Sequence, residues 1–328
     1  MIRICTILIL CLLTSQADAM VLKIATLSPD GSSWMIKMRD GAKEVAQKTG
    51  NRVRIKYYPG GVMGDDKTVL RKIRIGQLHG GVVVANSLVK YFSDNQIYSL
   101  PFKFKSFKEV DYVRERMDRL IVDGLEKGGF VTFGLAEGGF AYVMSHVPIR
   151  SVNDMRRHKV WVPDNDPVIL ETVKVFGITP IPLSIADVRA GLQTGLINTV
   201  TTSPIGAIVL QWHTQVNYLM DAPFLYIYGV FAVDRKAFSK ISPEDQSIVR
   251  KIMGRVFQEI DHKNRKDNIM AMETLQKQGI QLVKPSAEEL NEWYTIASTL
   301  PKRLIKTGKI SQHMLDTLEN NLQDFRSQ

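Results

Sequence analysis

One long helical segment near the C-terminal end constrains the fold of this 328-residue chain more than any other feature. Ser242-Pro243-Glu244-Asp245 is a typical helix start, because proline is favoured in the first helical turn. No further proline or clear stop occurs before Gly279. The pattern therefore predicts a helix over about 243–278, roughly 36 residues and ~54 Å long, which exceeds one small domain.

The apolar positions of this segment form two groups with a polar stretch between them. The first group runs from Ile248 to Ile260 and the second from Ile269 to Leu275, while residues 261–267 are polar. A helix turns its apolar face towards the core on which it packs. We therefore expect one helix that packs on two bodies in succession.

Short β-rich runs alternate with helical patterns along the rest of the chain, which predicts an α/β architecture. Ser106 to Glu109 forms a capping box that opens a helix. Two separate strands are expected at 130–136 and 141–145, and a second capping box at 184–187. The first part of the chain is expected to contain strand 21–27, a helix from 34 to 50, strand 53–57, helix 66–76 and strand 82–85.

These patterns predict two α/β lobes bridged by a long helix, a layout that can close over a ligand. The length suffices for about two domains, and the alternation restarts near 140–150. We assign 20–142 with about 230–262 to lobe I, and 143–229 with about 263–328 to lobe II. The long helix spans both lobes.

The N-terminal stretch 1–19 has the form of a secretory signal peptide. It has a basic start at Arg3, an apolar run up to Leu13, and the small-x-small sequence Ala17-Asp18-Ala19. A membrane anchor needs about 18 or more continuous apolar residues, and polar residues close this run early. We expect an exported protein that is not embedded in the membrane after cleavage.

The residue inventory excludes several kinds of chemistry. Both cysteines, Cys5 and Cys11, lie in the expected signal peptide, so thiol nucleophiles, disulfides and cysteine-type zinc sites are not expected. The histidines are scattered, which argues against a metal site on one helix face. No motif with a stated catalytic mechanism occurs. The net charge of +10 is spread over mixed helix surfaces, so nucleic acid is not an expected partner.

Aromatic and acidic residues gather at the ends of expected strands, where open α/β sheets place their ligand crevices. Each residue alone could equally serve in packing or helix capping. As a set they indicate a cleft rich in stacking surface. The candidates are Trp34 with Asp30, Asp65, Asn86, Glu137, Trp161 with Asp166, Trp212, and Tyr226 with Tyr228.

Four motifs in register resemble the solute receptors of TRAP (tripartite ATP-independent periplasmic) transporters, the DctP-type family. The likeness runs from about 21 to 300. The motifs are Tyr58-Pro59-Gly60-Gly61-Val62-Met63-Gly64-Asp65-Asp66, Leu100-Pro101-Phe102, Asn153-Asp154-Met155 leading to Lys159-Val160-Trp161-Val162-Pro163, and Leu192-Gln193-Thr194-Gly195-Leu196-Ile197-Asn198.

The resemblance implies a two-lobe periplasmic receptor, hinged by strands and a long helix. Such a receptor captures a small solute and delivers it to TRAP membrane subunits driven by an ion gradient. It implies neither catalysis nor a cofactor. The family's polar contact after the Gln-Thr-Gly turn maps to Thr202 or Ser203, and its aromatic residue near the second-lobe helix start maps to Ile185.

The chain departs from the family at the position that clamps the ligand carboxylate. The family usually carries a basic residue there, which suits bidentate binding by a guanidinium, whereas this chain has Trp161. A second family arginine would fall near Phe140 and is also missing. We expect a neutral or cationic solute stacked on Trp161, with help from Trp34, Trp212 or Tyr226. Alternatively, Trp161 packs inward and Arg189 supplies the carboxylate contact.

Two other functions stay open from the sequence. A periplasmic enzyme could use Glu137 and Asp166 as a carboxylate pair for acid–base chemistry in the cleft. A sensor subunit would bind a solute in the same site and differ only in its membrane partner.

We predict cleavage after Ala19, because the basic start, the apolar run and the small-x-small site occur together. N-terminal sequencing of the exported protein should begin at Met20. A mature protein that retains Cys5 or Cys11 would contradict this prediction.

Overall fold

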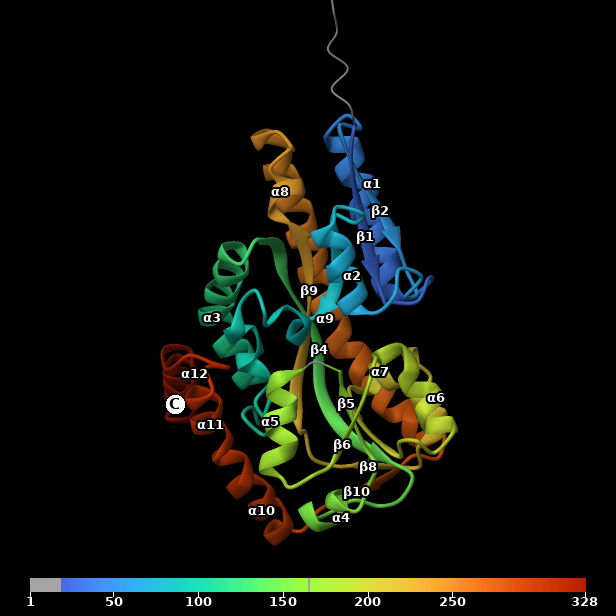
Figure 1. Ribbon diagram of the computed structural model, residues 1–328, viewed down its shortest axis with the longest axis vertical. Coiled ribbons are helices and arrows are strands. Elements are labelled where there is room, and N and C mark those ends of the chain that lie inside the picture. Colours follow the sequence, from blue (N-terminus) through green and yellow to red (C-terminus); the bar gives the residue numbers. More distant parts are fainter. Residues whose placement is uncertain (1–18, 165) are drawn as a thin grey trace, which may run out of the picture.

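Three elements run between the two halves of the molecule (Figure 1). They are strands β4 (Phe130–Ser145) and β9 (Leu225–Asp234) and helix α9 (Pro243–Lys277). The structure is a computed structural model and describes residues 19–164 and 166–328. The expected α/β, two-lobe architecture with a long bridging helix is confirmed.

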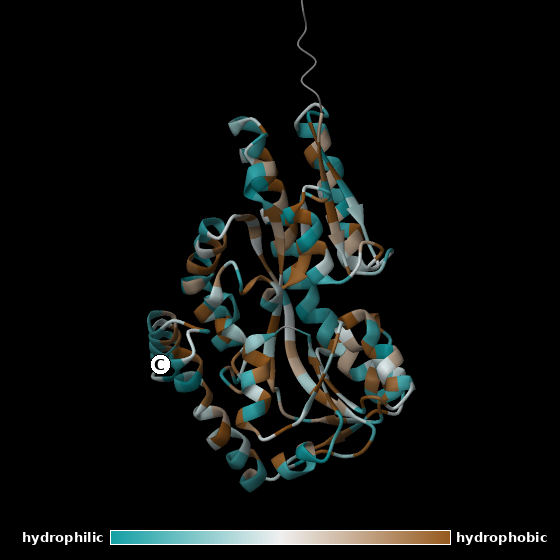
Figure 2. Cartoon of the chain, in the orientation of Figure 1, coloured by the Kyte–Doolittle hydropathy of each residue, from teal (hydrophilic) through white to brown (hydrophobic). Residues whose placement is uncertain are grey.

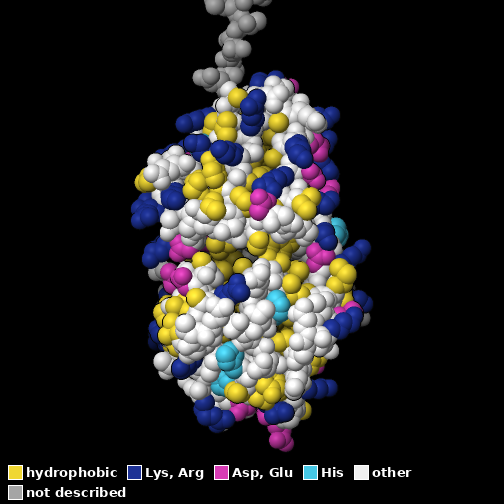
Figure 3. Space-filling model, turned by 90° about the vertical axis from the view of Figure 1, so that its right-hand side faces the viewer, with side chains coloured by type: hydrophobic (Ala, Val, Ile, Leu, Met, Phe, Trp, Pro, Cys, Tyr) yellow, Lys and Arg dark blue, Asp and Glu magenta, His cyan; other side chains and the backbone are white. Residues whose placement is uncertain are grey.

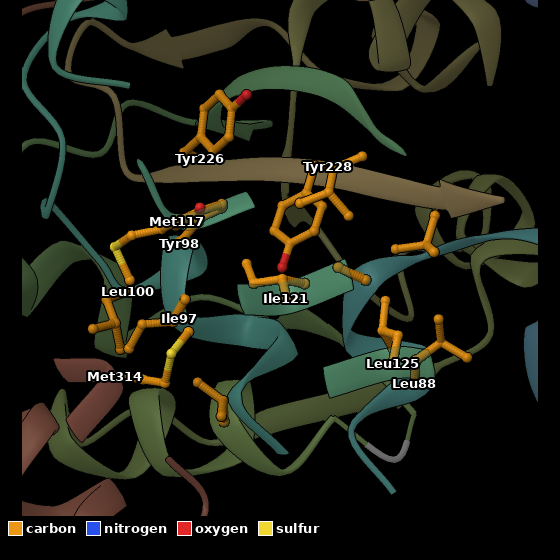
Figure 4. Packing of buried hydrophobic residues seen from close by; sticks show 14 of the residues in the cluster. Leu88, Ile97, Tyr98, Leu100, Met117, Ile121, Leu125, Tyr226, Tyr228 and Met314 are labelled. Atoms are coloured by element: carbon orange, nitrogen blue, oxygen red, sulfur yellow. The ribbon is translucent and has the colours of Figure 1, made fainter. Parts of the chain in front are cut away.

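Lobe I is built on a mixed sheet with the strand order β2-β1-β3-β9-β4. Strand β1 is parallel to its two neighbours, and β9 is antiparallel to both β3 and β4. One core beside this sheet packs Tyr98, Met117 and Tyr228 together (Figure 4). The other elements of this half are β1 (Met20–Thr26), α1 (Ser33–Lys48), β2 (Val53–Tyr58), α2 (Asp66–Arg74), β3 (Gly80–Val84), η1 (Ala85–Leu88), η2 (Ser93–Ser99), α3 (Phe107–Lys127) and α8 (Arg235–Phe238).

Lobe II continues from the second half of β4, which pairs antiparallel with β7 and β8. Strands β7, β5 and β6 are parallel to one another, and β10 pairs with β8. Hydrophobic residues concentrate on the central strands of both sheets (Figure 2). The elements are α4 (Val152–Arg156), β5 (Val160–Pro163), α5 (Pro167–Val175), β6 (Pro180–Leu183), η3 (Ile185–Asp187), α6 (Val188–Gln193), β7 (Thr199–Thr202), α7 (Pro204–Val209), η4 (Trp212–Gln215), β8 (Tyr218–Met220) and β10 (Gln281–Val283).

The C-terminal helices contact both lobes. Helix α10 (Ala287–Ser298) buries Trp293 in the core of lobe II, where its Nε1 donates to Arg150 O over 2.8 Å. After α11 (Leu300–Lys306), α12 (Gln312–Arg326) packs on α3 and places Leu318 in the core of lobe I. The lobe boundaries expected from the sequence stay a prediction, and these contacts favour assigning α12 to lobe I.

One expected capping box forms in part and the other is wrong. The Ser106 hydroxyl accepts from Glu109 N over 3.2 Å at the start of α3, as expected. At 184–187, Ser184 makes no cap bond to the backbone, because its hydroxyl donates to the Asp187 carboxylate over 2.6 Å. A 3₁₀ turn therefore precedes α6 there.

The two strands expected at 130–136 and 141–145 are one continuous strand, β4. Its pairing with β9 shifts register between Thr132 and Leu135 and again between Glu137 and Gly139. Bulges of this kind bend a strand without ending it. The sequence signs of a break between 136 and 141 therefore mark the second of these bends, near Glu137 and Gly139.

The polar middle of α9 packs against the second of these bends. Asn264 Nδ2 donates to Glu137 O over 2.5 Å, and Asn268 Nδ2 donates to Gly138 O over 3.1 Å. The apolar residues before this stretch enter a core of lobe I, and Leu275 after it enters a core of lobe II. The helix therefore packs on two bodies as predicted, but Ile269 and Met270, which were expected in the second apolar group, are exposed.

We predict that Gly139→Ala costs more stability than Gly279→Ala. Both glycines have positive φ, 90° and 96°, so each alanine carries a strain of about 1–2 kcal/mol. Only at Gly139 does a Cβ meet a neighbour, 2.7 Å from Asn268 Nδ2. Losing the bonds of Asn268 should add about 1–2 kcal/mol. Urea unfolding of both variants measures the difference, and equal losses would contradict the prediction.

Candidate functional site

A cavity of about 300 Å³ lies between the lobes. The ends of β1 and β3 line it from lobe I, the β5–α5 and β7–α7 segments line it from lobe II, and α9 contributes Phe257, Ile260 and Asn264. Hydrophobic side chains show in the recess that crosses the middle of one face (Figure 3). We call this space the inner cavity.

The inner cavity has an apolar wall with acidic but no basic side chains. Its charged residues are Asp66, Glu137 and Asp166, and no lysine or arginine lines it within the described part of the chain. Nine of the twelve candidate residues named from the sequence line it. These are Trp34, Asn86, Glu137, Trp161, Asp166, Thr202, Ser203, Trp212 and Tyr228.

The other three candidates lie elsewhere. Asp30 does not line the inner cavity, and its carboxylate accepts a hydrogen bond from Arg39. Asp65 caps α2, where its Oδ1 accepts from Thr68 N over 2.9 Å, and it lines an adjoining outer cavity of about 560 Å³. Tyr226 is 1% exposed and does not line the inner cavity. Arg189, the alternative carboxylate ligand, is also absent from the lining.

The Glu137 carboxylate is held by hydrogen bonds from side chains of neighbouring elements. Its carboxylate accepts from Arg265 over 2.5 and 3.1 Å and from the Tyr226 hydroxyl over 3.0 Å. Arg265 is in turn paired with Asp111 through two bonds of 2.8 Å. The Glu137 side chain is fully buried, so its charge is balanced inside the protein and not by a solute.

A second arginine completes this buried network. Arg114 donates to the Tyr226 hydroxyl over 3.1 Å and to Leu135 O over 2.8 Å, and it pairs with Asp261 over 3.0 Å. Burial raises the pKa of Asp261 to about 6, although Arg114 opposes this shift. Burial also holds the pKa of Tyr226 well above its usual range. The sequence analysis assigned Tyr226 to the solute, whereas its hydroxyl belongs to this network.

Three of the tryptophans line the inner cavity, namely Trp34, Trp161 and Trp212. Trp34 Nε1 donates to the Asn264 side chain, and Trp161 Nε1 donates to Leu183 O over 3.0 Å. Trp161 is 7% exposed and packs edge-to-face on Trp212, with ring centroids 5.1 Å apart. The indole donors of Trp34 and Trp161 are therefore used within the protein, which leaves their ring surfaces for contact with a solute.

Asp166 connects the lobes at the start of α5. Its Oδ1 accepts from Val168 N and Ile169 N over 3.0 and 2.9 Å, which caps the helix. It also accepts from the amides of Asn86 and Gln96, which lie on η1 and η2 of lobe I. Burial raises the pKa of Asp166, and these hydrogen bonds oppose that shift.

Two of the polar lining residues, Gln96 and Asp66, are not among the candidates expected from the sequence. Gln96 lies in an irregular segment with no helical or strand periodicity, so no sequence pattern singles it out. Asp66 belongs to the family-like motif but was read only as a helix start. Its Oδ2 accepts from Val84 N over 3.0 Å and from the Ser87 hydroxyl over 2.8 Å. Burial raises the pKa of Asp66 to about 6.

Polar lining groups from lobe II lie at the end of β7. Thr202 is buried, and Ser203 caps α7 by accepting from Gly206 N over 3.3 Å. Both side chains carry hydroxyls, which can donate as well as accept. They are the expected polar contacts after the Gln-Thr-Gly turn.

Neither carboxylate of the alternative acid–base pair is free. Glu137 is held by Arg265 and Tyr226, and Asp166 accepts from four donors. Among residues 19–164 and 166–328, no three His, Cys, Asp or Glu side chains are placed to hold a metal ion. No helix in those ranges is long and apolar enough to span a membrane.

Comparison with known proteins identifies relatives of this site and fold. The profile of the bacterial extracellular solute-binding proteins, family 7 (DctP), matches residues 24–307. The uncharacterized protein YiiZ of Salmonella typhimurium is 23% identical over 210 residues, which cover 63% of this chain and 64% of YiiZ. The match thus spans a little less than two thirds of that relative.

Two crystal structures share the fold. A TRAP periplasmic solute binding protein from Haemophilus influenzae with bound L-gulonate has a TM-score of 0.83 at 19% identity, and the match covers 92% of this chain and 98% of that one. DctP7 from Bordetella pertussis, an extracytoplasmic solute receptor binding pyroglutamic acid, has a TM-score of 0.83 at 19% identity, with 93% and 100% covered.

The raised pKa of Asp66 predicts a specific pH dependence of stability. The pKa in the folded state is about 6, above the ordinary 3.8, so the folded state holds the proton more tightly. The stabilisation is therefore complete below pH ~4 and is lost as the pH rises through about 6.

We expect the unfolding free energy of the wild type, relative to Asp66→Asn, to fall by up to about 3 kcal/mol between pH 4 and 7. Urea unfolding of both proteins across this range measures the difference. The contributions of the other titrating groups largely cancel in it, because both proteins contain those groups. A difference that is flat, or that grows with pH, would rule out the shift.

Proposed function

The chain belongs to the bacterial extracellular solute-binding proteins of family 7, and we propose that it is a periplasmic receptor for a small organic solute. The observation that carries this proposal is the inner cavity between two lobes that are joined by β4, β9 and α9. A site between two hinged bodies can enclose a ligand by domain closure.

We place the receptor in a TRAP-type transport system. The solute would be captured in the periplasm and delivered to the membrane subunits of a secondary transporter. The family membership and the expected signal peptide support this location. Receptor function needs no covalent chemistry. This agrees with the hydrogen bonds that hold the Glu137 and Asp166 carboxylates within the protein.

The solute is held without the arginine clamp that the family resemblance implies. L-Gulonate and pyroglutamic acid, the ligands of the two solved relatives, both carry a carboxylate. In the present chain Trp161 occupies the clamp position, and the described lining of the inner cavity contains no cation. We assign binding to the apolar walls, the tryptophan rings and the hydrogen-bonding groups of Asn86, Thr202 and Ser203.

The first test is whether the protein carries a solute. Protein purified from the periplasm and then denatured should release a small molecule that mass spectrometry detects. Added back at ~100 times its dissociation constant, that molecule should stabilise the fold by ~2.7 kcal/mol. Small-angle scattering should show compaction upon binding.

A matched pair of variants locates the solute. Ile227→Trp fills the inner cavity and should abolish rebinding, whereas Ile36→Trp lies at a position that is 52% exposed and should leave rebinding unchanged. A chemically altered product after incubation with the released molecule would favour the enzyme alternative. Rebinding without compaction would contradict domain closure.

A further inference from the structure

Four polar residues meet where the inner and outer cavities join. Asp66, Asn86 and Asp166 line both cavities, and Gln96 lines the inner one. We call these four residues the acceptor cluster. Three of them come from lobe I, and Asp166 comes from the start of α5 in lobe II.

Asp166 fixes which way the two amides of the cluster face. A carboxylate can only accept hydrogen bonds, so each amide must turn its NH₂ group towards Asp166. Asn86 Nδ2 does so, and Gln96 Nε2 does so over 3.1 Å. Both amide oxygens are therefore directed away from Asp166.

The amide oxygen of Gln96 is buried without a partner. Gln96 is 1% exposed, and no described group hydrogen-bonds to its Oε1. A buried carbonyl without a hydrogen-bond partner is energetically unfavourable. An acceptor maintained at that cost in the lining of a ligand cavity indicates that a ligand donor completes it.

Asp66 and Asn86 each supply one more acceptor. The two hydrogen bonds of Asp66 both reach Oδ2, so its Oδ1 has no partner among the described residues. The same holds for Oδ1 of Asn86, whose one side-chain hydrogen bond to a described residue is made through Nδ2. The cluster thus contains three side-chain oxygens that accept no hydrogen bond from a described residue.

The cluster also carries negative charge without a cation. No ion pair within the described ranges involves Asp66 or Asp166. Carboxylates enclosed by apolar walls are unfavourable unless an opposite charge compensates them. The basic residues of the outer cavity are exposed, so solvent and salt screen them. They are Lys67, Arg71, Arg74 and Lys90.

We infer that the acceptor cluster binds the cationic amine head of the solute, whose apolar body fills the inner cavity. This inference rests on the proposed receptor function. An ammonium group has three N–H donors and no acceptor, which suits a cluster that offers acceptors and carboxylate charge. Its bonds to the cluster are charge-assisted, and Phe257, Ile260 and Ile227 supply apolar wall for the body. A carboxylate at the same place would face acceptors and like charges.

Three probes of the same shape test the charge preference. 2-Phenylethylamine, 2-phenylethanol and phenylacetate differ mainly in the head group, and calorimetry at pH 8 on ligand-stripped protein measures their affinities. We expect the amine to bind at least ~10-fold more tightly than the alcohol, because hydrogen bonds from a charged donor are stronger than those from a neutral one. The acid should bind more weakly than the alcohol.

A conservative variant tests the cluster itself. Asp66→Asn keeps an acceptor for the bonds from Val84 N and Ser87 but removes the charge. It should weaken amine binding ~10-fold or more and change alcohol binding less than ~2-fold. Asp40→Asn removes the same charge from an exposed position of α1 and should change neither. Circular dichroism confirms that both variants fold.

The outcomes separate this inference from the receptor function. Equal or tighter binding of phenylacetate, binding of none of the probes, or an unchanged amine preference in Asp66→Asn would overturn the inference. If the molecule released from the purified protein is an acid that rebinds in the inner cavity, the receptor function stands and the inference fails. Release of no molecule would count against the receptor function instead.

Discussion

The polar packing of α9 against the bend of β4 is the contact on which both lobes depend. At Glu137 and Gly138 the strand departs from regular pairing, and side chains of α9 satisfy the freed backbone groups. Asp261 accepts from Glu137 N, and Arg265 neutralises the Glu137 carboxylate. Buried polar groups must be hydrogen-bonded, so the bend and the polar stretch of the helix require each other.

The inner cavity has no basic side chain in its described lining, because the nearby arginines pair with carboxylates in the buried network. The guanidinium groups of two arginines are bound within the buried network around Glu137. Arg114 pairs with Asp118 and Asp261. Arg265 pairs with Asp111 and Glu137. Of the carboxylates that line the inner cavity, Asp66 and Asp166 therefore have no ion pair among the described residues, whereas Glu137 is paired with Arg265. This distribution gives the site an acidic, hydrophobic lining in a protein whose net charge is +10.

The sequence predicted the parts of this structure that depend on local periodicity. The long helix and the α/β alternation follow from spacing alone, and the end-of-strand positions identified several residues of the cavity lining, among them Trp34, Trp161 and Asp166. The partners of individual side chains could not be predicted. Glu137 and Tyr226 join a network assembled from α3, β4, β9 and α9, and Gln96 is oriented by a carboxylate 70 residues away in the chain.

The C-terminal helices form a strap between the lobes in addition to the hinge. Trp293 fixes the strap in lobe II, Leu318 fixes it in lobe I, and Arg326 pairs with Glu109 at its far end. Two bodies held together at separate places cannot rotate about every axis. The strap therefore restricts the rotations that the three connecting elements alone would permit, and its seven-residue helix α11 lies between the two points of attachment.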